Sequence, residues 1–197
     1  GGLAEAMMPA HAAYEQQSGV KIVYTGAFAA ALGKSLLTGG GQTEVFAGRV
    51  LALAQNLRKS GKMVNFRPLC FTSYVIAVPK GNPAKIASIE DLTRPGVRVA
   101  MALEASAPGG QAVMGILKAA DISAKVLANV RAQGSCVQRS VADVTEGKAD
   151  AMIVERRITR MTRFADHLEY VEIPERFFPA GPLTFTVGMM ANAADPA

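Results

Sequence analysis

The sequence has few of the residues from which most enzymes and metal sites are built. Its 197 residues include two histidines and two cysteines, and Cys70 and Cys136 match no metal-binding or redox spacing. Neither His11 nor His167 stands beside a partnered serine or cysteine motif, and there is no P-loop and no Gly-x-Gly-x-x-Gly after a strand. We therefore predict no enzyme activity and no cofactor. The two thiols are expected to be reduced and mostly buried, with a single disulfide as the alternative.

Long apolar runs and nucleic-acid-binding motifs are also absent. No run approaches the ~20 apolar residues that span a bilayer, and no charged segment followed by an apolar one opens the chain, so we expect any secretory signal to have been removed. The net charge of +5 comes from scattered lysines and arginines without aromatic-plus-basic motifs, which predicts no nucleic-acid partner. This charge fits either a plain basic protein or a preference for anionic ligands. The densest basic group, at residues 156, 157, 160 and 163, has the helical spacing typical of a solvated face.

What the sequence does contain is a regular alternation of helix and strand patterns. Apolar stripes and capping residues predict helices over residues 3–17, 27–37, 50–60, 88–92, 109–119, 137–146 and 158–164. Short β-branched runs predict strands over residues 20–24, 44–47, 71–78, 97–101, 126–130, 151–154, 168–173 and 184–190. This alternation predicts an α/β protein with mostly parallel sheets and helices on both faces. Length and pattern favour two α/β lobes over one wide sheet.

Several segments, taken in order, carry a family resemblance. They are YEQQSGVKIVYTGAFAAALGKSL at 14–36, TEVFAG at 43–48, VIAVPKGNP at 75–83, SIEDLTRPGVRVAM at 88–101, SAPGGQAV at 106–113 and GKADAMIV at 147–154. This ordered set resembles the type II periplasmic substrate-binding proteins of ABC transporters, most closely the molybdate/tungstate-binding family. The resemblance implies a two-lobed fold with two crossover segments. Residues 1–74 and 187–197 would form lobe I, without the family's first strand and C-terminal helices, and residues 75–186 would form lobe II.

The same resemblance implies a function. The protein is expected to be a monomeric, extracytoplasmic receptor of an ABC importer that binds a small oxyanion between its lobes and meets the permease subunits at the membrane surface. Its expected location is the periplasm, or the outer side of the membrane as an anchored lipoprotein. One alternative is the effector-binding domain of a transcription regulator with the same fold, which would need a helix-turn-helix that this chain does not contain. Another is a receptor for a different ligand, such as a metal ion.

Helix starts are the expected oxyanion-binding groups. A helix N-terminus offers unsatisfied N–H donors and about half a positive charge. The resemblance implies that four such starts face the ligand: Gly2 and Leu3; Ala27, Phe28 and Ala29; Pro108 and Gly109; and Cys136 and Val137. Ordinary helix capping is the better explanation for each start taken alone. A thiol at a helix start can also be reactive or bind a soft metal, although a small buried residue is the more common role.

Three positions depart from the family pattern. The family's two serine ligands would fall near Gly2 and at Phe28 or Ala29, where no hydroxyl is present, and its tyrosine is replaced by Glu155. Relatives that bind tungstate or molybdate place a glutamate at this position as a direct ligand to the metal. Glu155 is therefore a candidate ligand to the metal centre of an oxyanion or to a bare cation. The alternatives are an acid favoured by the helix dipole or an ion pair with Arg156 or Arg157.

Overall fold

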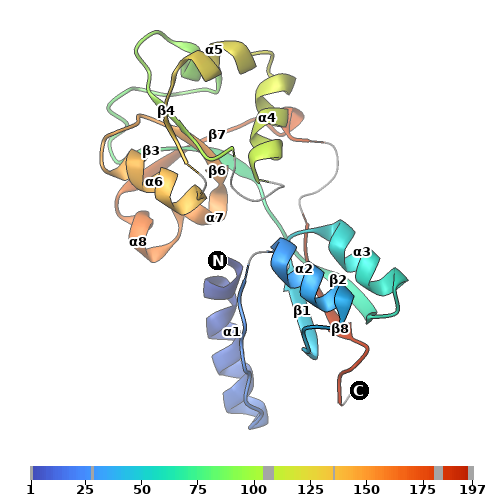
Figure 1. Cartoon of the computed structure of the whole chain (residues 1–197). Coiled ribbons are helices and arrows are strands. Elements are labelled where there is room, and N and C mark those ends of the chain that lie inside the picture. The colour runs from blue at the N-terminus through green and yellow to red at the C-terminus, as the bar shows by residue number, and fades with distance from the viewer. Residues whose placement is uncertain (1, 28, 104–108, 135, 180–183, 195–197) are drawn as a thin grey trace. The chain divides into compact units, whose positions relative to one another are not determined.

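The computed structural model of the protein describes residues 2–27, 29–103, 109–134, 136–179 and 184–194 (Figure 1). The chain forms two compact units. Unit 1 comprises Gly1–Phe71 and Leu183–Ala197, and unit 2 comprises Thr72–Pro182. Among the described helices, none is both long and apolar enough to cross a membrane.

Unit 1 is a three-stranded sheet with helices. Its elements are α1 (Gly2–Ser18), α2 (Ala29–Thr38), β1 (Val45–Gly48), α3 (Leu51–Lys59), β2 (Met63–Phe71) and β8 (Thr184–Met190). Strand β8 lies between β1 and β2 and is antiparallel to both. Helix α3 packs against all three strands. The core gathers apolar side chains from the helices and the sheet: Leu36, Phe46, Ala54, Leu57, Met63 and Met190.

Unit 2 contains the longer run of elements. They are β3 (Tyr74–Pro79), the 3₁₀ helix η1 (Glu90–Thr93), β4 (Val99–Met101), α4 (Gly109–Ala119), α5 (Ser123–Ala128), β5 (Val130–Gln133), α6 (Val137–Thr145), β6 (Met152–Glu155), α7 (Arg156–Thr159), α8 (Thr162–Ala165), β7 (Leu168–Glu172) and the 3₁₀ helix η2 (Glu175–Phe177). Strand β3 is buried along most of its length because it lies between β6 and β7. Strands β4 and β5 form a parallel pair.

The structure confirms the α/β class and corrects the prediction of mostly parallel sheets. In the described strands, β8 is antiparallel to β1 and β2, and β3 is antiparallel to β6 and β7. Strands β1 and β2 therefore run parallel to each other, as a strand–helix–strand unit requires, but β8 from the far end of the chain lies between them. Strand β3 separates β6 and β7 in the same way. A strand inserted from a distant part of the chain leaves no signal in the local pattern.

Four local predictions also differ from the structure. Residues 20–24 form no strand among the described residues, and Val23 is 92% exposed. Residues 126–130 fall in α5 and the start of β5, and residues 158–164 divide into α7 and α8 because Met161 is extended. The strand predicted over 71–78 is β3, which begins only at Tyr74, and the preceding strand β2 was not predicted. Most of β2 is exposed, and it carries Pro68, so its sequence lacks the apolar run of a buried strand.

An ion pair joins the amino ends of β4 and β6 in unit 2. The Nε and Nη2 atoms of Arg98 donate to the Asp150 carboxylate at 3.2 and 2.6 Å. The third guanidinium nitrogen, Nη1, donates to the Gly147 carbonyl at 2.9 Å. Burial by itself would raise the pKa of the Asp150 carboxyl. Hydrogen bonds from the Arg98 side chain and amide, together with the Arg98 charge, outweigh this effect, so the pKa is lowered. A lowered pKa means that the pair stabilises the fold above the pKa of an unfolded aspartate and that this stability is lost as the pH falls through the folded value.

We expect Asp150→Asn to lower the free energy of unfolding at pH 7 by about 1 kcal/mol, as for a partly exposed ion pair. The difference from the unsubstituted protein should shrink as the pH falls from the pKa of an unfolded aspartate, about 3.9, through the lower pKa of Asp150 in the folded protein. Urea unfolding at pH 7 and pH 3 measures both effects. The exposed Asp121, whose positive φ of 56° asparagine also tolerates, provides the matched control Asp121→Asn. Equal stability of Asp150→Asn and Asp121→Asn at pH 7 would contradict this role.

Candidate functional site

The candidate site residues of unit 2 follow three neighbouring strands. Strand β5 is parallel to β4, with Met101 paired with Gln133. A parallel bridge joins Val99 of β4 to Ala151, just before β6, and the Ala100 amide donates to the Ala151 carbonyl at 2.9 Å. The three strands therefore end at one edge, where ligands bind in open α/β sheets. We call it the carboxyl edge of unit 2.

Each of these strands leads into a predicted site residue. The next helix along the chain after strand β4 is α4, which begins at Gly109. Strand β5 is followed by Cys136, the residue before the first residue of α6, Val137. Strand β6 ends at Glu155, and α7 begins at the next residue. The structure thus gathers Gly109, Cys136, Val137 and Glu155 at the carboxyl edge. Pro108 lies outside the described residues.

The start of α6 is held against β4 and has no side-chain cap. Cys136 is extended, with φ −132° and ψ 119°, and its side chain makes no capping hydrogen bond. It is exposed, and so is Cys70 in unit 1, so the prediction of mostly buried thiols is wrong. The Ser140 hydroxyl donates to the Met101 carbonyl at 3.4 Å, which ties the first turn of α6 to the end of β4. The first amides of α6 are therefore positioned by the sheet and left without a cap from Cys136.

The start of α4 approaches the backbone after β4 very closely. A Cβ atom placed on Gly110 would lie 2.3 Å from the Leu103 carbonyl oxygen and 2.9 Å from its carbon. No side chain fits between two pieces of main chain at that distance. Gly110 therefore fixes how closely the first turn of α4 sits to the carboxyl edge. The sequence signal for this contact is the Gly109-Gly110 doublet.

Glu155 is a buried carboxylate with an arginine partner. It is 6% exposed, and its Oε2 atom accepts a hydrogen bond from Arg157 Nε at 2.5 Å. Its side chain makes no capping hydrogen bond to α7. Of the alternatives left open by the sequence, the ion pair with Arg157 is therefore present. The pair has no net charge, so the carboxyl edge does not present a bare carboxylate at this position.

The basic group around Arg157 is more than a solvated face. Arg156 and Arg157 are each partly buried, and each is paired with a carboxylate, Glu172 and Glu155 respectively. Only Arg160 and Arg163 are exposed, as their helical spacing predicts. Sequence reasoning missed this division because Glu172 lies in β7, whose neighbours cannot be read from local spacing.

The unit 1 candidates lie at two helix starts. Gly2 is the first residue of α1 and Leu3 is its half-buried second residue. Ala27 is exposed before α2, and Ala29 is the first residue of that helix. Phe28 lies outside the described residues. The described candidates of unit 1 therefore lie at the first turns of α1 and α2, where main-chain N–H groups lack partners within the helix.

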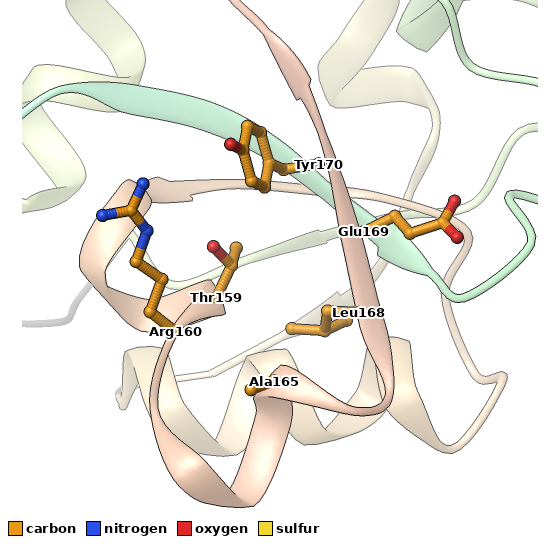
Figure 2. A pocket seen from close by; sticks show the side chains of 6 residues that line it. All are labelled: Thr159, Arg160, Ala165, Leu168, Glu169 and Tyr170. Carbon is orange, nitrogen blue, oxygen red and sulfur yellow. The ribbon is translucent and has the colours of Figure 1, made fainter.

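A separate hollow lies beside α7, α8 and β7 (Figure 2). Its volume is about 570 Å³ and its lining residues are Thr159, Arg160, Ala165, Leu168, Glu169 and Tyr170. The polar ends of Arg160 and Tyr170 lie on the same side of it, and the Glu169 carboxylate points away from them (Figure 2). None of the predicted site residues that the structure describes lines this hollow. Within the described part of the chain, no three His, Cys, Asp or Glu side chains are grouped as a metal site would require.

The family model of the bacterial extracellular solute-binding proteins matches residues 1–197. The chain belongs to this family. No curated protein matches it in sequence.

Solved structures with the same fold agree with the type II binding-protein prediction. A substrate-binding domain assigned to a molybdenum ABC transporter of Clostridium difficile superposes with a TM-score of 0.77 at 18% identity, covering 96% of this chain and 81% of that one. PEB3 of Campylobacter jejuni with L-phospholactate bound gives 0.72 at 21% identity, with 99% and 86% covered. The periplasmic molybdate-binding protein of Azotobacter vinelandii gives 0.69 at 13% identity, with 98% and 84% covered. At these low sequence identities, the structural similarity establishes the fold and does not identify the ligand.

Proposed function

We propose that this solute-binding protein is the extracytoplasmic receptor of an ABC importer and that it binds a small oxyanion between its two units. The observation that carries the proposal is the carboxyl edge of unit 2, where the starts of α4 and α6 and the neutral Glu155–Arg157 pair follow neighbouring parallel strands. Binding rather than catalysis accords with the family. The expected partners are the permease subunits, which the receptor meets as a monomer on the periplasmic side of the membrane.

Helix starts suit an oxyanion because they bind it without a full counter-charge. The first amides of a helix lack partners within the helix and point along its axis, with about half a positive charge between them. Cys136 does not cap α6 with its side chain, and Gly110 lets the start of α4 lie close to Leu103, just after β4. An oxyanion at this edge would accept hydrogen bonds from both starts, and the starts of α1 and α2 would supply the donors of unit 1.

The Glu155–Arg157 pair explains how a carboxylate is compatible with an anion. An unpaired Glu155 would repel an oxyanion strongly at low dielectric. Paired with Arg157, it adds no net charge, and the guanidinium is held in place beside the site. Direct coordination of the oxyanion's metal centre by Glu155 is the second possibility. Neutralisation of Arg157 and metal coordination predict different changes in ligand affinity when the carboxylate is removed.

The ligand class is broader than molybdate. The serine hydroxyls of the family are replaced by Gly2 and by Phe28 or Ala29, so the site relies on main-chain donors that serve any tetrahedral oxyanion. Structures with this fold carry names that include molybdate, tungstate, sulfate and L-phospholactate. We therefore propose a receptor for tetrahedral oxyanions with a specificity weaker than that of a dedicated molybdate receptor.

A thermal-shift screen tests the proposal directly. A ligand that binds only the native protein stabilises it by about 2.7 kcal/mol at a hundredfold excess over Kd, which should raise Tm by roughly 5–10 °C in a chain of this size. The panel contains molybdate, tungstate, sulfate, phosphate, L-phospholactate and divalent metal chlorides, with sodium chloride at matched ionic strength as the control. A screen in which no oxyanion raises Tm above the chloride control would refute the oxyanion assignment. A shift with a divalent metal alone would make the protein a cation receptor.

A further inference from the structure

The Arg156 side chain contacts three other residues of unit 2, which are Ser73, Tyr170 and Glu172. Its Nε donates to the Ser73 hydroxyl at 3.0 Å, its Nη1 donates to the Tyr170 hydroxyl at 3.4 Å, and its Nη2 pairs with the Glu172 carboxylate. The guanidinium carbon lies 5.0 Å from the centre of the Tyr170 ring, a cation–π contact. Tyr170 also walls the hollow of Figure 2. A planar guanidinium held from three directions has little freedom to move.

The residue that Arg156 holds is at the boundary between the two units. The first segment of unit 1 ends at Phe71, and unit 2 begins at Thr72, so Ser73 belongs to the first connection between the units. The Arg156 amide donates to the Ser73 carbonyl at 2.9 Å, in addition to the side-chain bond to the Ser73 hydroxyl. One arginine therefore fixes both the main chain and the side chain of Ser73.

The register of the sheet ties the same connection to the candidate ligand site. Tyr74, the first residue of β3, is paired with Glu155, the last residue of β6. The bond from the Arg156 amide to Ser73 is the next step along the same pair of strands. Glu172, the partner of the Arg156 side chain, belongs to β7 on the other side of β3. Arg156 therefore ties β6, β3 and β7 together at the point where the chain leaves for unit 1.

We propose that Arg156 is a positioning residue that couples the Glu155 turn to the Thr72–Ser73 connection. The effect of this coupling on ligand binding rests on the proposed function. An oxyanion that orders the Glu155–Arg157 turn also displaces Arg156, which lies within that turn. Because Tyr170 and Glu172 hold the guanidinium of Arg156 rigidly, the displacement is passed on to Ser73 and so to the Thr72–Ser73 connection. Ligand binding in unit 2 is thereby converted into a change at the Thr72–Ser73 connection, the kind of segment at which hinge motions occur in two-unit proteins.

Ser73 allows a test that leaves the arginine in place. Ser73→Ala removes the acceptor of Arg156 Nε and leaves the Glu172 pair and the Tyr170 contact. Ser73→Thr restores the hydroxyl. Thr93→Ala is the matched control, because it removes a hydroxyl that donates to the Glu90 carbonyl at 2.8 Å elsewhere in unit 2. Amide hydrogen exchange in the ligand-free protein reports the coupling itself, and small-angle scattering with sodium molybdate or sodium tungstate reports closure.

In Ser73→Ala we expect the Arg156 amide and the Glu155 turn to exchange roughly fivefold faster, with no change in η1, because one hydrogen bond of the coupling is lost. The decrease in radius of gyration at saturating molybdate or tungstate should be smaller, and the affinity for that anion roughly fivefold weaker. Ser73→Thr should restore all three quantities. Exchange at Arg156 that is unchanged in Ser73→Ala, or that rises equally throughout unit 2, would overturn the proposal. If the unsubstituted protein binds none of the oxyanions in the thermal-shift panel, the proposed function fails, and the exchange result alone decides the coupling.

Discussion

Replacing Arg157 with glutamine should lower the free energy of unfolding by about 3–5 kcal/mol, the range for removing one partner of a buried ion pair. The residue left behind is Glu155, which is 6% exposed and would lose the hydrogen bond from Arg157 Nε. The same change would remove the positive charge that Arg157 places beside Glu155 at the carboxyl edge of unit 2. We therefore expect the affinity for molybdate or tungstate to fall at least tenfold, or by about 1.4 kcal/mol or more.

The reciprocal change separates the two roles left for Glu155. Glu155→Gln leaves Arg157, whose side chain is 28% exposed and reaches water, so we expect a smaller loss of about 1–2 kcal/mol in unfolding free energy. If the carboxylate only neutralises Arg157, the oxyanion should bind more tightly. If it coordinates the metal of molybdate or tungstate, binding of these anions should be abolished while sulfate binding is retained.

Calorimetric titration and urea unfolding measure these effects, with the double variant completing a thermodynamic cycle. Arg160→Gln is the matched control, because Arg160 is exposed on the same short segment and has no ion pair among the described residues. It should leave stability and affinity unchanged. An Arg157→Gln variant that folds and binds oxyanions like Arg160→Gln would show that the Glu155–Arg157 pair has no part in the site.

Elements with a complete local pattern could be predicted from the sequence. The helix predicted over 109–119 is α4, and the strand predicted over 184–190 is β8. The segment at 126–130 failed because Val126 and Leu127 give an apolar run too short to distinguish a strand from a buried turn of helix. Strand β2 was missed because its pairing with β8, and not burial of its own side chains, makes it a strand.

The candidate site likewise has parts that could be predicted from the sequence and parts that could not. The starts of α4 and α6 follow from the order of strand, loop and helix, so Gly109 and Val137 could be assigned in advance. The contact of Arg156 with Ser73 joins residues 83 positions apart and depends on which residue of β3 faces Glu155. That register is decided when the sheet forms. The pairing of Glu155 was therefore an open alternative in the sequence, while the role of Arg156 could not be seen there.

Replacing Gly110 with alanine should damage both the fold of unit 2 and its ligand site. All three atoms nearest to the added Cβ belong to the main chain of Leu103, with the carbonyl oxygen at 2.3 Å, so no side chain can turn away to make room. Either the start of α4 or the end of β4 must move. We expect a loss of about 1–3 kcal/mol in unfolding free energy, as for an overpacked core position.

The effect on binding follows from where α4 begins. A displaced first turn carries its amide donors away from the carboxyl edge, and losing one hydrogen bond to a charged ligand weakens binding by about 1.5–3 kcal/mol, or roughly ten- to a hundredfold. The control is Gly115→Ala in the same helix. There the added Cβ meets only Pro179 Cγ, at 3.4 Å, so the helix should gain up to about 1 kcal/mol from its better propensity.

The same substitution, glycine to alanine, should therefore change the free energy of unfolding in opposite directions at Gly110 and Gly115 of α4. Urea unfolding should show Gly110→Ala less stable and Gly115→Ala more stable than the unsubstituted protein, and calorimetry with molybdate or tungstate should show weaker binding in the first variant alone. Because a substitution at Gly110 strains the contact with Leu103 even if no ligand binds nearby, stability by itself does not decide the site. An affinity retained in Gly110→Ala, despite its lowered stability, would remove the start of α4 from the site and leave α6 and the Glu155–Arg157 pair as the unit 2 groups that meet the ligand.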